Sequence, residues 1–181
     1  MKALVFSDIH GSLSAARFLA DEIERQRPDV VLLLGDFLYH GPRNPLPDTY
    51  DPRGVVEILN QHADAIIAVA GNCDSLVDKG LLKFPVCSDF SWFYADGLRI
   101  FLTHGDRITP ENLPPLREGD IFLFGHTHIP LASSHGPNYL CNPGSISLPK
   151  EGHPESFGII ENGSFSVLTR SGEKYLHLMY C

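Results

Sequence analysis

Three short apolar segments divide the first half of the chain at regular intervals. Residues 3–6, 30–34 and 66–70 are almost entirely hydrophobic. Unbroken apolar runs of this length are typical of strands that are buried on both faces of a parallel sheet. We therefore expect these three segments to form neighbouring parallel strands.

Helix-like patterns fill the intervals between the strands. Residues 14–25 place apolar side chains three and four positions apart, which predicts an amphipathic helix that Ser12 or Ser14 would cap. A second helix is predicted to begin at Asp51, a capping carboxylate, followed by Pro52 in the first helical position. The alternation of strand and helix predicts right-handed crossovers.

The second half of the chain has the pattern of hairpins. Residues 89–94 and 98–102 flank Asp96-Gly97, a turn pair that is favoured in two-residue hairpin loops. Residues 121–124 form another buried strand, and further turns are expected at Gly136-Pro137-Asn138 and Asn162-Gly163. The predicted fold is α/β, with two mixed β-sheets packed as a sandwich and helices flanking them.

Length and charge narrow the class of protein. The chain has 181 residues, 43% of them hydrophobic, which suits a single domain over residues 1–181. The net charge is −8, from 14 basic and 22 acidic residues. We therefore expect no general nucleic-acid binding, because that function requires a basic surface.

Cysteine content and hydropathy indicate the cellular compartment of the protein. No apolar stretch approaches the length of a signal-peptide core or a membrane span, so we expect a cytoplasmic protein that does not bind membranes. The four cysteines form no Cys-x-x-Cys pair, which favours free thiols in a reducing compartment. They are Cys73, Cys87, Cys141 and Cys181.

Side chains that bind metals follow five of the apolar segments. Ligands in open α/β sheets bind just beyond the carboxyl ends of the strands. Two aspartates, one asparagine and several histidines gathered there would form a mixed oxygen and nitrogen site for divalent metals. These residues are Asp8, His10, Asp36, Asn72, His104, His126 and His128.

Each of these motifs alone has a simpler explanation. Gly71-Asn72 suits a tight turn with positive φ angles, and Gly125-His126-Thr127-His128 could be a pair of exposed strand histidines. Turn chemistry, however, does not require metal-binding side chains at five strand ends. The whole set therefore favours a two-metal hydrolase.

The order of these motifs resembles the calcineurin-like metallophosphoesterase superfamily. More narrowly, Gly71-Asn72-Cys73-Asp74, Gly125-His126-Thr127-His128 and Asn142-Pro143-Gly144-Ser145 look like motifs of its small bacterial YfcE-type phosphodiesterases. The resemblance covers residues 2–149. It implies a four-layer, metallo-dependent phosphatase-like fold and hydrolysis of small phosphodiesters, with two divalent ions as cofactors. Mn²⁺ is the ion that it favours, although the ligand chemistry also permits Fe, Zn, Ni or Co.

The same resemblance implies how the ligands are shared. One ion would be held by Asp8, His10, Asp36 and His128, and the other by Asp36, Asn72, His104 and His126. Asp36 would then bridge two ions about 3.5–4 Å apart, and a hydroxide held between them would attack phosphorus in line.

The chain departs from many members of the family at one position. In those relatives a histidine follows the asparagine and is thought to protonate the leaving group, whereas here Cys73 occupies that position. A thiol is a poorer proton donor than an imidazolium, so His40 is a candidate substitute. A loop histidine held by hydrogen bonds is an equally good explanation of His40.

Three residues are candidates for contact with the substrate. Arg43 could reach a phosphate from the rim, and Asn142 and Ser145 could present an amide and a hydroxyl to it. A solvated arginine and an ordinary Pro-Gly turn are the alternatives. Exposed aromatic side chains around Trp92 could belong to the interface of a homo-oligomer.

Two alternative functions compete with the phosphodiesterase. A phosphomonoesterase is disfavoured, because the arginine-bearing Gly-Asp motif and the Asn-His pair of such relatives are missing. A non-catalytic scaffold like the retromer adaptor of the same fold is also disfavoured, because adaptors of this kind typically have eroded ligand sets.

Overall fold

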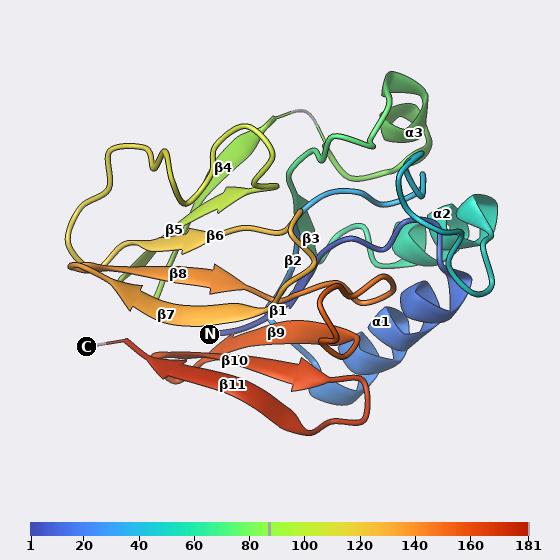
Figure 1. Ribbon diagram of the computed structural model, residues 1–181. Coiled ribbons are helices and arrows are strands. Elements are labelled where there is room, and N and C mark those ends of the chain that lie inside the picture. Colours follow the sequence, from blue (N-terminus) through green and yellow to red (C-terminus); the bar gives the residue numbers. More distant parts are fainter. Residues whose placement is uncertain (87, 181) are drawn as a thin grey trace.

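The computed structural model describes residues 1–86 and 88–180. Within them the chain forms two β-sheets and three helices (Figure 1). The sheets pack face to face, and two of the helices lie against the outer side of the larger sheet. Figure 1 also shows that the N-terminus and the end of the last strand lie on the side away from the helices.

The larger sheet has six strands in the order β11-β10-β9-β1-β2-β3. The three N-terminal strands pair in parallel, as the alternating pattern predicts, and β9 joins β1 in the antiparallel direction. The β9–β10 and β10–β11 pairs are antiparallel as well. The strands are β1 (Lys2–Phe6), β2 (Val30–Leu33), β3 (Ile66–Ala68), β9 (Ser156–Glu161), β10 (Ser164–Thr169) and β11 (Lys174–Met179).

The smaller sheet has five strands in the order β4-β5-β6-β8-β7. Its hairpins β4–β5 and β7–β8 are antiparallel, whereas β5–β6 and β6–β8 pair in parallel. The strands are β4 (Phe90–Ala95), β5 (Leu98–Thr103), β6 (Ile121–Leu123), β7 (Leu131–His135) and β8 (Asn138–Asn142).

The helices begin where capping chemistry places them. Helix α1 (Leu13–Gln26) starts after Ser12, whose side chain accepts a hydrogen bond from the backbone of Ala15. Helix α2 (Pro52–Gln61) starts after Asp51, with the proline in its first turn. The short helix α3 (Leu76–Leu81) carries a capping box between Ser75 and Asp78.

Hydrophobic side chains fill three separate layers. One cluster packs α1 and α2 against the larger sheet, and a second fills the space between the sheets. A third covers the outer face of the smaller sheet, where segment 104–120 packs Ile108, Leu113 and Leu116 against Phe101 and Phe122. This segment forms bends and turns.

The predicted architecture of two mixed sheets packed together with flanking helices is confirmed, and α1 and α2 lie against the larger sheet. The hairpins predicted at Asp96-Gly97, 136–138 and Asn162-Gly163 are also present. No described helix has the length and apolar character needed to cross a membrane. Of the cysteines that the structure describes, Cys73 and Cys141 are free, and Cys87 and Cys181 lie outside the described residues.

Candidate metal centre

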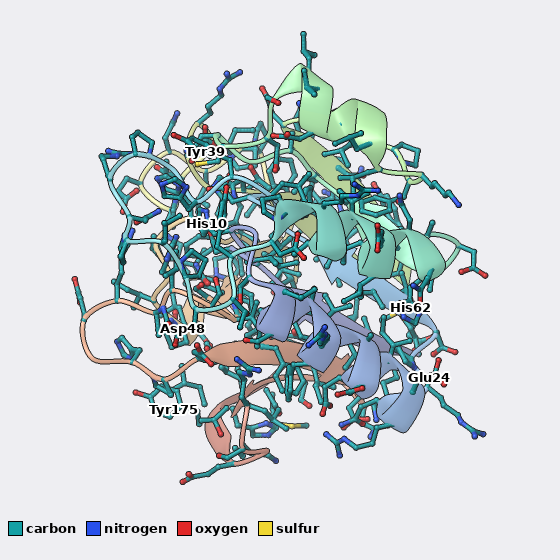
Figure 2. The ribbon with its side chains drawn as sticks, turned by 90° about the vertical axis from the view of Figure 1, so that its right-hand side faces the viewer. His10, Glu24, Tyr39, Asp48, His62 and Tyr175 are labelled. Atoms are coloured by element: carbon teal, nitrogen blue, oxygen red, sulfur yellow. The ribbon has the colours of Figure 1, made fainter. Side chains whose placement is uncertain are left out.

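The candidate ligands share one position in the fold, just past the carboxyl end of β1, β2, β3, β5 or β6. Strands of both sheets end at this edge, so side chains from distant parts of the chain meet there. Figure 2 shows His10 on the loop side of the molecule, away from Glu24 and His62 at the far ends of α1 and α2. The structure brings together Asp8, His10, Asp36, Asn72, His104, His126 and His128.

Most of these residues have an uncommon backbone conformation. Among the described residues, ten that are not glycine have a positive φ, and five of those ten are candidate ligands. Such conformations cost roughly 1–3 kcal/mol each and persist where the surrounding structure enforces them, often at functional sites. The five are Asp8 (φ 58°), His10 (φ 50°), Asp36 (φ 59°), His126 (φ 63°) and His128 (φ 61°).

Asp8 forms one cluster with two histidines. Its Oδ1 lies 3.2 Å from Nε2 of His128 and 3.6 Å from Nε2 of His10, and the two Nε2 atoms are 3.2 Å apart. This oxygen is buried and has no hydrogen-bond partner. Its other oxygen, Oδ2, accepts a hydrogen bond from the Ser7 hydroxyl at 2.6 Å.

Asp36 lies between this cluster and a second one. Its Oδ2 is 3.6 Å from Nε2 of His10 and 3.4 Å from Nε2 of His104. His104 Nε2 is also 3.1 Å from Oδ1 of Asn72 and 3.2 Å from Nδ1 of His126. The carboxylate of Asp36 therefore faces both groups of side chains.

Backbone carbonyls orient three of the histidines. Nδ1 of His10 donates to the carbonyl of Tyr39 at 2.8 Å, and Nδ1 of His104 donates to that of Leu34 at 2.6 Å. Nδ1 of His128 makes the same type of bond with the carbonyl of residue 148 at 2.5 Å. A carbonyl can only accept, so each Nδ1 carries a proton and, in the neutral ring, Nε2 has a free lone pair.

These distances fit divalent cations. Two atoms that each bind one ion at about 2.0–2.2 Å are usually about 3–3.5 Å apart, close to the separations in both clusters. The buried Asp8 Oδ1 without a hydrogen-bond partner faces imidazole nitrogens, which a cation would bridge. Among the described residues, three triplets of side chains place one ligand atom each within 4.8 Å of the others: Asp8-His10-His128, Asp8-Asp36-His104 and His10-Asp36-Cys73.

Asp8 and Asp36 favour positive charge on the neighbouring groups, and the pKa values of the candidate ligands reflect this. Burial alone would raise the pKa of Asp8, but His10 and His128 hold it well below its usual range. Burial opposes the charged form of His104, yet Asp36 and Asp8 raise its pKa to about 9. Burial and the neighbouring His104 lower the pKa of His126.

Asp74 supports the Asp36 loop, a role that the sequence did not reveal. This aspartate is 8% exposed and accepts hydrogen bonds from the backbone N–H groups of Asp36, Phe37 and Gly71 at 2.8–2.9 Å. Burial raises its pKa to about 6, although these bonds favour the charged form. Its partners lie up to 38 positions away, so no local pattern could have identified them.

Two predicted substrate contacts lie behind the centre. Asn142 and Ser145 are both 0% exposed, and neither lines the pocket that opens over the candidate metal centre. Asn142 Nδ2 donates to the carbonyl of Gly125 at 2.9 Å, and the Ser145 hydroxyl donates to the carbonyl of Asp8 at 2.9 Å. Their polar groups hold the loops that carry the candidate ligands.

A pocket of about 280 Å³ opens over the centre. Asp36, Asn72, His126 and His128 line it. Its rim carries two basic side chains, the predicted Arg43 and also Lys150, which no motif of the sequence indicated. The pocket thus combines a positively charged rim with an interior of candidate ligands.

The two candidates for proton transfer are placed differently. Cys73 lines the pocket, and burial together with Asp36 raises the pKa of its thiol to about 12. His40 does not line the pocket; its ring packs edge-on against Tyr39 and Tyr50, and its buried Nδ1 has no hydrogen-bond partner.

The fold and the site define a metal-binding α/β protein whose centre lies at the shared edge of two mixed sheets. Residues 1–164 match the calcineurin-like phosphoesterase superfamily domain. The chain therefore belongs to the calcineurin-like phosphoesterase superfamily, as its motifs predicted.

Individual relatives agree with this assignment. The chain is 43% identical to phosphodiesterase YfcE of Escherichia coli K12 over 176 residues, which cover 97% of this chain and 96% of the relative. The solved structure of YfcE, described as a phosphoesterase from E. coli, superposes with a TM-score of 0.98 at 42% identity and covers both chains fully. Vps29 of Entamoeba histolytica, solved as a complex with Zn²⁺, shares the fold alone, with a TM-score of 0.63 at 19% identity over 98% of each chain.

Proposed function

We propose that this chain is a phosphodiesterase that hydrolyses small phosphodiesters with two divalent metal ions. The observation that carries the proposal is the position of Asp36, whose Oδ2 lies within 3.6 Å of imidazole nitrogens from both clusters. The 43% identity to a protein named phosphodiesterase YfcE supports the diesterase activity. Asp8, His10, Asp36 and His128 would hold one ion, and Asp36, Asn72, His104 and His126 the other.

The charge of the ligand set suits an anionic substrate. Only Asp8 and Asp36 among the seven candidate ligands are acidic, so two divalent cations would leave the centre positive. When bound, the ions would activate a water molecule and offset the charge that develops on the phosphoryl oxygens. Mn²⁺ fits this mixed oxygen and nitrogen set, as do Fe, Zn, Ni and Co.

The residues of the chain contribute orientation and attraction. The Nδ1 bonds of His10, His104 and His128 fix the rings, so little reorganisation is needed during reaction. Arg43 and Lys150 at the rim would attract the phosphodiester.

Several finer points stay predictions. Protonation of the leaving group by His40 is one of them, and the pH dependence of kcat for His40→Asn tests it. A cytoplasmic location and a homo-oligomeric state are others.

One experiment separates the proposal from its two alternatives. The purified protein is stripped with a chelator, and its rates on p-nitrophenyl phosphate and bis(p-nitrophenyl) phosphate are measured before and after addition of Mn²⁺. We expect diester hydrolysis to disappear and return with the metal, and to exceed monoester hydrolysis. A higher rate on the monoester would favour a phosphomonoesterase, and fewer than one bound ion per chain after loading would favour a scaffold.

A further inference from the structure

A second pocket shares His126 with the pocket over the candidate metal centre. It has a volume of about 460 Å³. His126 lines both pockets, so the two pockets adjoin each other at this candidate ligand. We call the second one the acidic pocket, because Asp106 and Glu111 line it.

The walls of the acidic pocket are suited to an apolar group. Phe124, Ile129 and Leu131 line it on the side of the smaller sheet. Its opposite wall belongs to segment 104–120, which is anchored to that sheet through Ile108 and Leu113. The pocket is therefore held open by packed side chains, as is usual for sites that bind small organic molecules.

The charges of the two pockets differ in sign. No lysine or arginine is among the described residues that line the acidic pocket. Arg107 lies nearby, 3.8 Å from Asp106, but it is exposed and makes its closer pair, at 2.9 Å, with Asp89. The pocket over the metal centre has Arg43 and Lys150 instead. A negatively charged group is thus repelled from the acidic pocket and attracted to the other one.

We infer that the acidic pocket binds one of the two ester substituents of the substrate, and that this substituent is apolar and either neutral or positively charged. The other substituent, which is polar or negatively charged, lies beside Arg43 and Lys150. The substrate class is then an unsymmetrical phosphodiester that spans His126. The inference rests on the proposed function, because it requires a diester at the metal centre.

Methylphosphonate monoesters test the inference, because they resemble a diester in which one substituent is only a methyl group. Their inhibition constants are measured against hydrolysis of bis(p-nitrophenyl) phosphate by the manganese-loaded protein. The varied ester group is methyl, benzyl or trimethylammonioethyl. Burial of one apolar group typically changes binding about tenfold or more, so we expect the benzyl and trimethylammonioethyl esters to bind about tenfold more tightly than the methyl ester.

Two variants test whether the tighter binding of the larger esters comes from the acidic pocket. Thr109→Trp fills the pocket from the loop and should remove the gain for both larger esters. Glu111→Lys should weaken the trimethylammonioethyl ester several-fold and leave the benzyl ester nearly unchanged. Glu118→Lys is the matched control, since Glu118 is exposed on the same segment and does not line the pocket.

The outcomes separate this inference from the proposed function. If the manganese-loaded wild type does not hydrolyse the diester, the proposed function fails and the inference fails with it. If it hydrolyses the diester but the three esters inhibit equally, or none inhibits, only the inference is overturned. The inference is also overturned if the larger esters still bind more tightly than the methyl ester in Thr109→Trp. It is overturned as well if Glu118→Lys and Glu111→Lys weaken binding of the trimethylammonioethyl ester equally.

Discussion

The carboxylate of Asp74 accepts a hydrogen bond from the backbone N–H of Asp36, with 2.8 Å between the nitrogen and Oδ2. The same oxygen accepts from Gly71, also at 2.8 Å. One buried side chain thus ties together the loops after β2 and β3, which carry the candidate ligands Asp36 and Asn72. The geometry of the metal centre depends on residues that do not themselves face the pocket.

Asp74→Asn should weaken both the fold and the metal centre. The new amide group replaces one acceptor with a donor that faces backbone N–H groups. The free energy of unfolding should fall by about 1–3 kcal/mol, and Mn²⁺ affinity should fall roughly 10- to 100-fold. Urea unfolding and calorimetric titration measure the two effects. Asp78→Asn, in the exposed cap of α3, is the control, and unchanged metal affinity in Asp74→Asn would contradict the supporting role.

Gly71→Ala should disrupt the same loop through steric overlap. A Cβ at this position would lie 2.1 Å from Oδ1 and 2.5 Å from the backbone nitrogen of Asp36. Overpacking of this kind costs about 1–3 kcal/mol, and displacement of Asp36 should abolish metal-dependent hydrolysis.

Gly80→Ala is the matched control for that substitution. Gly80 lies in α3 with no atom within 4 Å of the added Cβ. Alanine in a helix is favoured over glycine by about 0.5–1 kcal/mol, so this variant should be slightly more stable and fully active. An active Gly71→Ala enzyme would show that the close approach to Asp36 is unimportant.

Asn142→Ala and Ser145→Ala should lower kcat more than they raise KM. Both side chains are buried and hold the loops of Asp8 and His126. Their loss removes the side-chain acceptors of the backbone N–H groups of Gly144, Ser147 and Leu148. We expect a loss of about 1–3 kcal/mol in stability, which thermal unfolding measures. Arg43→Ala, at the exposed rim, should raise KM without changing stability. If the two buried variants instead raise KM and leave kcat unchanged, Asn142 and Ser145 contact the substrate.

The sequence predicted the elements whose signals are local. Asp51-Pro52 marks the start of α2, and Asp96-Gly97 marks the β4–β5 turn, because capping and turn geometry depend on adjacent residues. The shared location of the candidate ligands could also be predicted, because each follows an apolar strand. The short helix α3 and the partly exposed strand β11 have weaker patterns and were not predicted.

The supporting residues could not be identified in the same way. The hydroxyl of Ser145 bonds to a carbonyl 137 positions away, and the Asn142 amide bonds to one 17 positions away. Only the folded chain shows whether a polar side chain after a strand faces the pocket or the loop behind it. Lys150 is a similar case, because its place at the rim follows from the path of a loop.

Asp36→Asn should affect both proposed ions, because its carboxylate faces both clusters. An amide binds a divalent cation more weakly than a carboxylate, so the manganese content should fall from two ions per chain toward none. His135→Gln, an exposed substitution away from the centre, should keep both ions. Elemental analysis after desalting gives the counts, and an unchanged count in Asp36→Asn would contradict the bridging position.

Anomalous diffraction from a manganese-loaded crystal tests the shared centre most directly. The account predicts two anomalous peaks about 3.5–4 Å apart, with the carboxylate of Asp36 in contact with both. A single peak, or two peaks with the Asp36 side chain turned away from either of them, would contradict it.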